Sequence, residues 1–105
     1  NYKNRYWKKS YFDAVAMLRG LCEKHGMSII EATYRWMAFH SMLNMERGDA
    51  IIIGVSKLSQ LHRNVEAIAG GRLPQELTDA FEAAWQFTKQ DAPQYYRFYN
   101  PTSNI

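Results

Sequence analysis

One short stretch constrains the fold of this chain more than any other, namely residues Ala50 to Val55, which include three consecutive isoleucines. Apolar residues follow one another there without polar alternation, which is typical of a strand buried on both faces of a parallel sheet. Such a strand needs a neighbour on each edge, because a buried backbone donor or acceptor left unpaired costs about 1–3 kcal/mol. The remaining sequence offers no second strand. The pattern therefore predicts one core strand at about Ala50–Val55 in a chain that looks incomplete.

Helical patterns fill most of the remaining sequence. Four helices are expected, from Ser10 to His25, from Ser28 to about Leu43, from Leu58 to the Gly70-Gly71 pair, and from Leu73-Pro74 to just before Pro93. Ser10 with Asp13, and Ser28 with Glu31, have the spacing of capping boxes at the first two helix starts. A turn is expected at Arg47-Gly48-Asp49, just before the strand. A strand followed by a helix at the end of a run of helices suggests the last repeat of a larger α/β sheet or barrel.

Each of these helices carries an apolar stripe, which predicts the face that it buries. In the first helix the expected stripe is Tyr11, Val15, Leu18 and Cys22, and in the second it is Ile29, Ile30, Thr33, Trp36, Met37 and His40. In the third it is Leu58, Leu61, Val65 and Ile68, and in the fourth Leu77, Phe81, Ala84, Trp85 and Thr88.

Composition and charge exclude several classes of protein. Hydrophobic residues make up 47% of the chain and charged residues 22%, which is typical of a folded domain rather than a disordered one. The longest aliphatic run is far too short to span a bilayer, so no membrane segment is expected. The single cysteine, Cys22, excludes an internal disulfide and favours a reducing compartment such as the cytoplasm. With the histidines expected on separate helices, we expect no metal site.

The first eleven residues mix positive charge with aromatic rings. Such a mixture can bind nucleic acid or a phosphate group, but it is also typical of a solvated segment whose rings tuck under a neighbour. The basic residues are Lys3, Arg5, Lys8 and Lys9, and the rings are those of Tyr2, Tyr6, Trp7 and Tyr11. The net charge of +3 is mild, and we expect no nucleic acid as a partner.

The most informative residues follow the expected strand. Gly54 and Ser56 lie just before a helix start, where the first backbone N–H groups lack intrahelical partners and the helix dipole favours a phosphate. Lys57 and Arg63 add positive charge there. One helix face would carry Gln60 and Asn64, four residues apart, which can meet an adenine or ribose edge. The simpler alternative is that Ser56 or Ser59 only caps the helix.

The order strand, Gly54, Ser56, Gln60-Leu61, Asn64 resembles the last barrel strand and following helix of the aldo-keto reductases. Further runs resemble the aflatoxin aldehyde reductase branch of that family, in the same order: Asn4-Arg5-Tyr6-Trp7-Lys8, Ala32-Thr33-Tyr34-Arg35-Trp36-Met37, Gly48-Asp49-Ala50-Ile51-Ile52 and Ala83-Ala84-Trp85. The resemblance extends from about Asn1 to Arg97. It implies that residues 1–105 form the C-terminal segment of a (β/α)8 TIM barrel, an α/β fold in which phosphate sites commonly follow the last strands.

The resemblance also implies a function and the residues that carry it. The family transfers hydride from NADP(H) to an aldehyde or ketone, with a tyrosine as proton donor supported by Asp, Lys and His. Those four residues belong to the first half of the barrel, so we expect no catalytic residue in this chain and no activity from it alone. Six residues would hold the 2′-phosphate and adenosine of NADP(H): Gly54, Ser56, Lys57, Gln60, Arg63 and Asn64. The family more often has an acidic residue where Arg63 stands, and Arg97 is expected to contact the substrate.

Two readings of the whole chain remain open at this stage. One is a C-terminal part of an NADP(H)-dependent reductase, whose partners would be the N-terminal remainder of the barrel, or further copies of the chain, and a small aldehyde or ketone. The other is a non-enzymatic helical interaction module, or a degenerate reductase remnant that pairs its strand with a partner chain. The preserved residues from Gly54 to Asn64, together with Arg97, favour the first reading.

Overall fold

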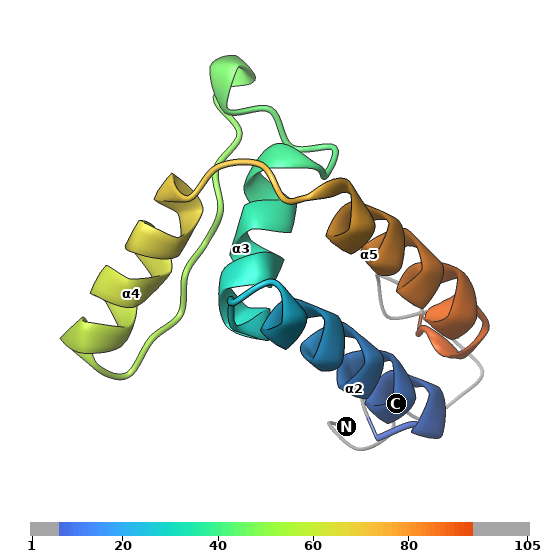
Figure 1. The fold of residues 1–105 in the computed structure, drawn as a ribbon. Helices are drawn as coiled ribbons and strands as arrows, with labels where there is room; N and C mark the ends of the chain where they lie inside the picture. The colour runs from blue at the N-terminus through green and yellow to red at the C-terminus, as the bar shows by residue number, and fades with distance from the viewer. Residues whose placement is uncertain (1–6, 94–105) are drawn as a thin grey trace, which may run out of the picture.

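The computed structural model describes residues 7–93, and it is built from helices (Figure 1). The α-helices and the short 3-10 helices η1 and η2 follow in the order α2 (Lys9–Lys24), α3 (Ile29–Phe39), η1 (Met45–Arg47), α4 (Leu58–Ala69), α5 (Gln75–Thr88) and η2 (Lys89–Asp91). Helices α2 and α5 lie side by side, α3 crosses at one end of this pair, and α4 lies on the far side of α3. The prediction of a mostly helical chain is confirmed for this part.

Helix α2 begins and ends within one residue of its predicted bounds, but its cap differs from the prediction. Lys8 is the N-cap and makes no capping hydrogen bond with its side chain. Ser10 lies inside the first turn, and its hydroxyl donates instead to Oδ2 of Asp91 at 2.5 Å. The capping box at Ser10 is therefore wrong, because a distant carboxylate takes the hydroxyl. Gly26 has φ of +72°, as expected of a left-handed stop.

Helix α3 begins as predicted and ends early. Ser28 is its N-cap, and its Oγ accepts a hydrogen bond of 3.0 Å from the backbone N–H of Glu31. The Glu31 carboxylate binds Arg35 at 2.8 Å, so it does not complete the box. The helix ends at Phe39 rather than near Leu43. Helix α4 matches its predicted bounds, with the Gly70-Gly71 pair after it. Helix α5 begins as predicted after Pro74 but ends at Thr88, and the 3-10 helix η2 takes its place before Pro93.

The strand expected at residues 50–55 is absent from the described part of the chain. Residues 50–55 instead run without regular structure from η1 toward the start of α4 (Figure 1). The physical reason is the missing partner. A strand exists only when a second strand pairs with it, and residues 7–93 supply none. Ile52 is accordingly 96% exposed.

The core lies between α2, α5 and the start of α3. Its fully buried members include Cys22, Ala32 and Leu77, and the rings of Trp36 and Phe81 stack beside them with centroids 5.9 Å apart. In α2 the buried stripe is Ser10, Ala14, Leu18 and Cys22. The stripe is thus rotated from the predicted one, and Val15, which was expected inside, is 40% exposed.

Helix α5 shows the same shift of its buried face. Leu77, Ala80 and Ala84 are buried, whereas Trp85 is 51% exposed. Alanines lie at the α2–α5 contact, whereas the larger side chains of Val15 and Trp85 are exposed. Side-chain size, and not hydrophobicity alone, therefore decides which face of each helix is buried.

Candidate functional site

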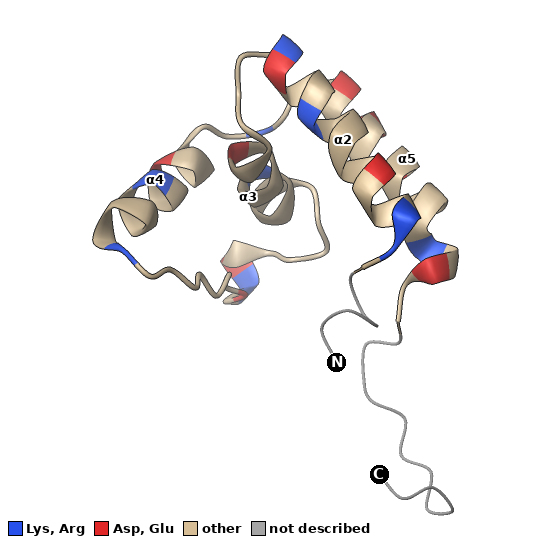
Figure 2. Cartoon of the chain, turned by 90° about the horizontal axis from the view of Figure 1, so that it is seen from below, with Lys and Arg blue, Asp and Glu red and all other residues tan. Residues whose placement is uncertain are grey.

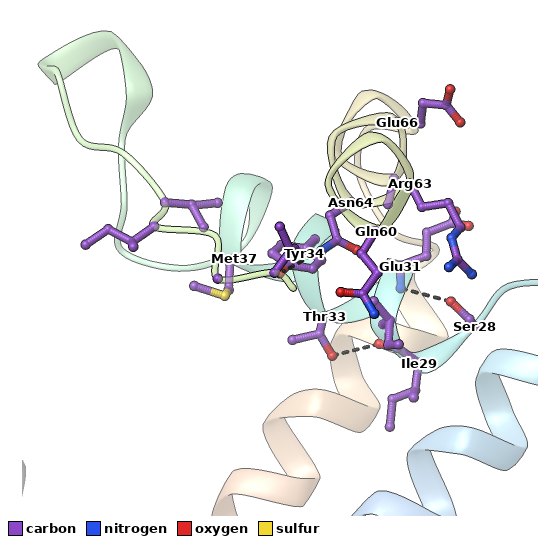
Figure 3. Close-up of a pocket in the computed structure, with 16 residues that line it drawn as sticks. Ser28, Ile29, Glu31, Thr33, Tyr34, Met37, Gln60, Arg63, Asn64 and Glu66 are labelled. Carbon is purple, nitrogen blue, oxygen red and sulfur yellow. Dashed lines mark hydrogen bonds between the residues drawn. The ribbon is translucent and has the colours of Figure 1, made fainter. Parts of the chain in front are cut away.

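An open cleft with a volume of about 990 Å³ lies between α3 and α4. Helix α3 forms one wall with Thr33, Tyr34 and Met37, and α4 forms the other with Gln60 and Asn64. In Figure 3 the Gln60 and Asn64 side chains extend toward α3, whereas Glu66 points away from it. The segment of residues 51–55 that precedes α4 also contributes to the lining.

The start of α4 carries the polar groups that the sequence singled out. Lys57 is the N-cap and makes no capping hydrogen bond with its side chain. Neither Ser56 nor Ser59 caps the helix, so the simple capping alternative does not describe this structure. The side chain of Gln60 instead folds back on Ser56, accepting at Oε1 from the Ser56 backbone N–H at 3.1 Å and from its hydroxyl at 3.4 Å.

Asn64 lies one turn further along α4 and faces α3. Its Nδ2 donates a hydrogen bond of 3.3 Å to the hydroxyl of Tyr34. Arg63, next to it in sequence, is exposed and lies at the edge of the cleft. This edge therefore holds a cationic side chain beside two side-chain amides, which can bind a ligand that is anionic at one end and carries a base or sugar at the other.

The structure gathers most of the residues expected at a cofactor site. Gly54, Gln60, Arg63 and Asn64 line the cleft. Ser56 joins it through its hydrogen bonds to Gln60, and Lys57 is exposed at the adjacent helix start. Arg97 lies outside the described residues. The sequence reasoning missed the opposite wall, because Thr33, Tyr34 and Met37 sit at helical spacing in α3 and the first and last of these were assigned to its buried face.

Comparisons with known proteins show which family this chain belongs to. A sequence model of the Aldo/keto reductase family matches residues 1–86. The chain belongs to the aldo/keto reductase family. It is 40% identical over 100 residues to aldo-keto reductase family 7 member A3 of Homo sapiens, covering 91% of this chain and 30% of the relative. It is 39% identical over 100 residues to aflatoxin B1 aldehyde reductase member 2 of Homo sapiens, covering 91% of this chain and 28% of the relative.

A fungal relative gives a similar match, which again covers only part of its length. The chain is 38% identical over 95 residues to an aldo-keto reductase of Pseudocercospora fijiensis, covering 90% of this chain and 32% of that protein. The chain thus spans about a third of the length of the curated relatives that it matches. The resemblance to the aflatoxin aldehyde reductase branch is confirmed, and family membership implies a TIM barrel.

An arginine of this aldo/keto reductase chain holds α4 against α3. The side chain of Arg35, only 11% exposed, donates to the carbonyl oxygens of Gly71 at 2.8 Å and Arg72 at 2.7 Å, just after α4. Its third partner is the carboxylate of Glu31 at 2.8 Å. A cation beside the last carbonyls of a helix also interacts favourably with the helix dipole. Arg35 therefore fixes one end of the helix whose other end forms the candidate site.

His40 holds the same connection from the other side. Its Nε2 accepts a hydrogen bond of 2.9 Å from the backbone N–H of Leu73, and a guanidinium nitrogen of Arg72 lies 3.4 Å from its Nδ1. Burial lowers the pKa of His40, and the positive charges of Arg72 and Arg35 lower it further. The imidazole thus stays neutral and keeps its acceptor nitrogen at neutral pH.

Metal ligands and reactive thiols do not add to the site. Within residues 7–93 no three His, Cys, Asp or Glu side chains group closely enough to hold a metal ion. Cys22 is fully buried, and this burial raises the pKa of its thiol, with the carboxylates of Glu23 and Glu31 acting in the same direction. The thiol is therefore a core group. No helix within residues 7–93 has the length and apolar character needed to cross a bilayer.

The charged residues of the described chain are mixed in sign. Lys and Arg alternate with Asp and Glu along the helices (Figure 2). Lys9 is paired with Asp13 at 2.7 Å, and Lys8 donates to the backbone carbonyl of Asp91. Lys3 and Arg5 of the basic aromatic stretch lie outside the described residues. Lys8 and Lys9 of that stretch thus contact residues of the same chain.

Proposed function

We propose that this chain is the C-terminal part of an NADP(H)-dependent aldo-keto reductase that reduces aldehydes or ketones to alcohols. In this proposal it supplies the 2′-phosphate and adenosine part of the cofactor site and a part of the substrate pocket. The single observation that carries the proposal is the convergence of Gly54, Gln60, Arg63 and Asn64 on one cleft beside an uncapped helix start. Family membership supports the reaction class.

The phosphate end of the cofactor fits the start of α4. Lys57 and Arg63 are exposed cations, and charge-assisted hydrogen bonds to phosphate are stronger than neutral ones. The Ser56 hydroxyl is only loosely engaged, since its 3.4 Å contact with Gln60 is long for a hydroxyl donor. It can therefore turn to a phosphate oxygen while the Ser56 backbone N–H keeps its hydrogen bond to Gln60. A Cβ built at Gly54 meets no atom within 4 Å, so the backbone there is open to close approach.

The adenosine end fits the two amides of α4. Gln60 and Asn64 lie on one face of the helix, toward the α3 wall (Figure 3). The apolar side chains that line the cleft offer a surface against which a base can pack. When bound, the nicotinamide of the cofactor supplies the hydride, and the tyrosine, Asp, Lys and His that handle the proton belong to the upstream half of the barrel. This chain alone is expected to be inactive, and Arg97 is proposed to contact the substrate.

A double substitution tests the proposed phosphate site in the complete polypeptide. Ser56→Ala with Lys57→Ala should raise the Michaelis constant for NADPH about tenfold or more, because hydrogen bonds to charged groups contribute about 1.5–3 kcal/mol. The constant for NADH should change little, since NADH lacks the 2′-phosphate. Steady-state kinetics with both cofactors measure this. Ser59→Ala, on the same exposed turn, is the matched control, and equal effects on the two cofactors would place the phosphate elsewhere.

We also propose that α4 needs covering by other protein. Within Leu58–Ala69 no residue is buried, and Leu58 and Val65 are 68% and 53% exposed. The N-terminal remainder of a barrel, or another copy of the chain, would cover this surface. We therefore expect sedimentation equilibrium of the isolated chain to show self-association. A monomer with cooperative unfolding and a concentration-independent Tm would favour the alternative function, an autonomous helical interaction module.

A further inference from the structure

Two hydrogen bonds tie the last described helix of the chain to the start of the first. The Ser10 hydroxyl, in the first turn of α2, donates to Oδ2 of Asp91 in η2 at 2.5 Å. Nζ of Lys8 donates to the backbone carbonyl oxygen of the same aspartate. These partners are 81 and 83 positions apart in sequence, so the contact joins the two ends of the described chain.

The Ser10–Asp91 hydrogen bond has the features of a strong one. Its length falls in the range of a hydroxyl that donates to a carboxylate, about 2.5–2.7 Å, and such bonds are about twice as strong as neutral ones. Ser10 is only 9% exposed, so little water competes for its hydroxyl. The start of α2 does not use this hydroxyl either, because Lys8 holds the N-cap position.

This hydrogen bond fixes the position of the last described residues. Asp91 is the final residue of η2, and the backbone becomes extended at Ala92, with φ of −69° and ψ of 132°. Pro93 follows, and its ring restricts the backbone further. In Figure 1 this segment lies beside the start of α2. The contact with Ser10 therefore holds the point from which the C-terminal segment continues.

Arg97, the proposed substrate contact, follows Pro93 by four residues. Four residues span at most about 14 Å, so the place of Asp91 limits where the Arg97 guanidinium can bind. We propose that Ser10 and Asp91 are positioning residues for the substrate, and that their hydrogen bond holds the C-terminal segment where Arg97 reaches the pocket. This inference rests on the proposed function.

The test compares two aldehydes that differ in one carboxylate, because a guanidinium binds a carboxylate through paired, charge-assisted hydrogen bonds. The KM for 4-carboxybenzaldehyde and for 4-methylbenzaldehyde is measured with NADPH on the complete polypeptide. Ser10→Ala should raise the KM for the carboxylated aldehyde about tenfold, the loss expected when one hydrogen bond to a charged group is weakened. The KM for the methylated aldehyde, kcat and the dissociation constant of NADPH should change by less than about twofold.

Variants of Asp91 test whether the hydrogen bond itself carries the effect. Asp91→Ala should match Ser10→Ala, and the double variant should be no worse than either, because both changes remove the same interaction. Asp91→Asn keeps an oxygen that accepts from Ser10 and should retain most of the affinity. Asp13→Ala removes an exposed carboxylate from α2 and is the matched control, with an unchanged KM for both aldehydes.

Arg97→Ala separates the inference from the proposal beneath it. If Arg97→Ala raises the KM for the carboxylated aldehyde and Ser10→Ala does not, the inference is wrong and the proposed function stands. Equal increases for both aldehydes in Ser10→Ala would also overturn it, as would a further increase when Ser10→Ala is added to Arg97→Ala. If Arg97→Ala changes neither KM, the proposed substrate contact is wrong, and the inference is wrong with it.

Discussion

The two halves of the described chain are held together by different forces. Helices α2 and α5 pack through small and medium apolar side chains, with Ala14, Leu18, Ala80 and Ala84 in one buried cluster. Helix α4 contributes no buried residue, and hydrogen bonds of Arg35, His40 and Tyr34 join α4 and the residues just after it to α3. The α2–α5 pair therefore has a core of its own, whereas α4 is held largely by polar contacts and leaves Leu58 and Val65 exposed.

This difference bears on function because the candidate site lies in the half with the smaller core. A cleft between α3 and α4 stays open to a ligand since no apolar layer closes it. The same openness leaves the cleft dependent on a few polar contacts, chiefly those of Arg35 and Tyr34. Substitutions in the α2–α5 pair should therefore lower stability through lost apolar burial, and those at the α3–α4 contact through lost hydrogen bonds. The sizes of these two effects should also differ.

Replacing a core leucine should give the largest effect. Leu77 is fully buried, so Leu77→Ala should lower the free energy of unfolding by about 2–5 kcal/mol, through lost burial and the cavity left behind. Val65→Ala, at a 53% exposed position of α4, should change it by no more than about 0.5 kcal/mol. Urea denaturation of the isolated chain measures both. Equal losses would contradict the comparison, and a large loss for Val65→Ala in the complete polypeptide alone would show that other elements cover α4.

Removing the Arg35 guanidinium should have the next largest effect. Arg35→Met keeps the length of the side chain but leaves the carbonyl oxygens of Gly71 and Arg72 without this donor, at an expected cost of about 1.5–3 kcal/mol. Lys9→Met removes an exposed ion pair with Asp13 and should matter far less, because solvent screens such pairs. Urea denaturation of the two variants would show this order. A reversed order would mean that Arg35 does not fasten α4.

Acidification should weaken the contact between His40 and the segment that joins α4 to α5, with a smaller loss of stability. The folded pKa of His40 is lowered below the value of 6.5 expected in the unfolded chain, so the unfolded chain takes up the proton first. Stability is then constant above pH 6.5 and falls as the pH decreases toward the folded pKa, where the Leu73 N–H loses its acceptor.

The decrease can be followed as the Tm between pH 7.5 and 5.5. His40→Gln offers an acceptor that does not titrate and should reduce this decrease. His62→Gln, at an exposed position of α4, is the control and should leave it as in the unsubstituted chain. A pH dependence that is the same in all three proteins would rule out His40 as its source.

Local signals in the sequence were sufficient to predict most of the helix boundaries. Gly26, Ser28 and Pro74 mark helix ends through their own backbone preferences, so these boundaries could be predicted to within a residue or two. Gln60 and Asn64 share a helix face by spacing alone. The assignment to the reductase family likewise depended on residues read in order along the chain.

Tertiary structure decided what depends on contacts between distant segments. Helical periodicity defines a broad apolar stripe, but the neighbouring helix selects Ala14 over Val15 as its buried member. Ser10 resembles a cap until Asp91, far along the chain, takes its hydroxyl. A run of isoleucines becomes a strand only when another strand pairs with it. The contact between Asn64 and the Tyr34 hydroxyl joins α4 to α3, and residues 30 positions apart in sequence meet there only because the two helices pack together.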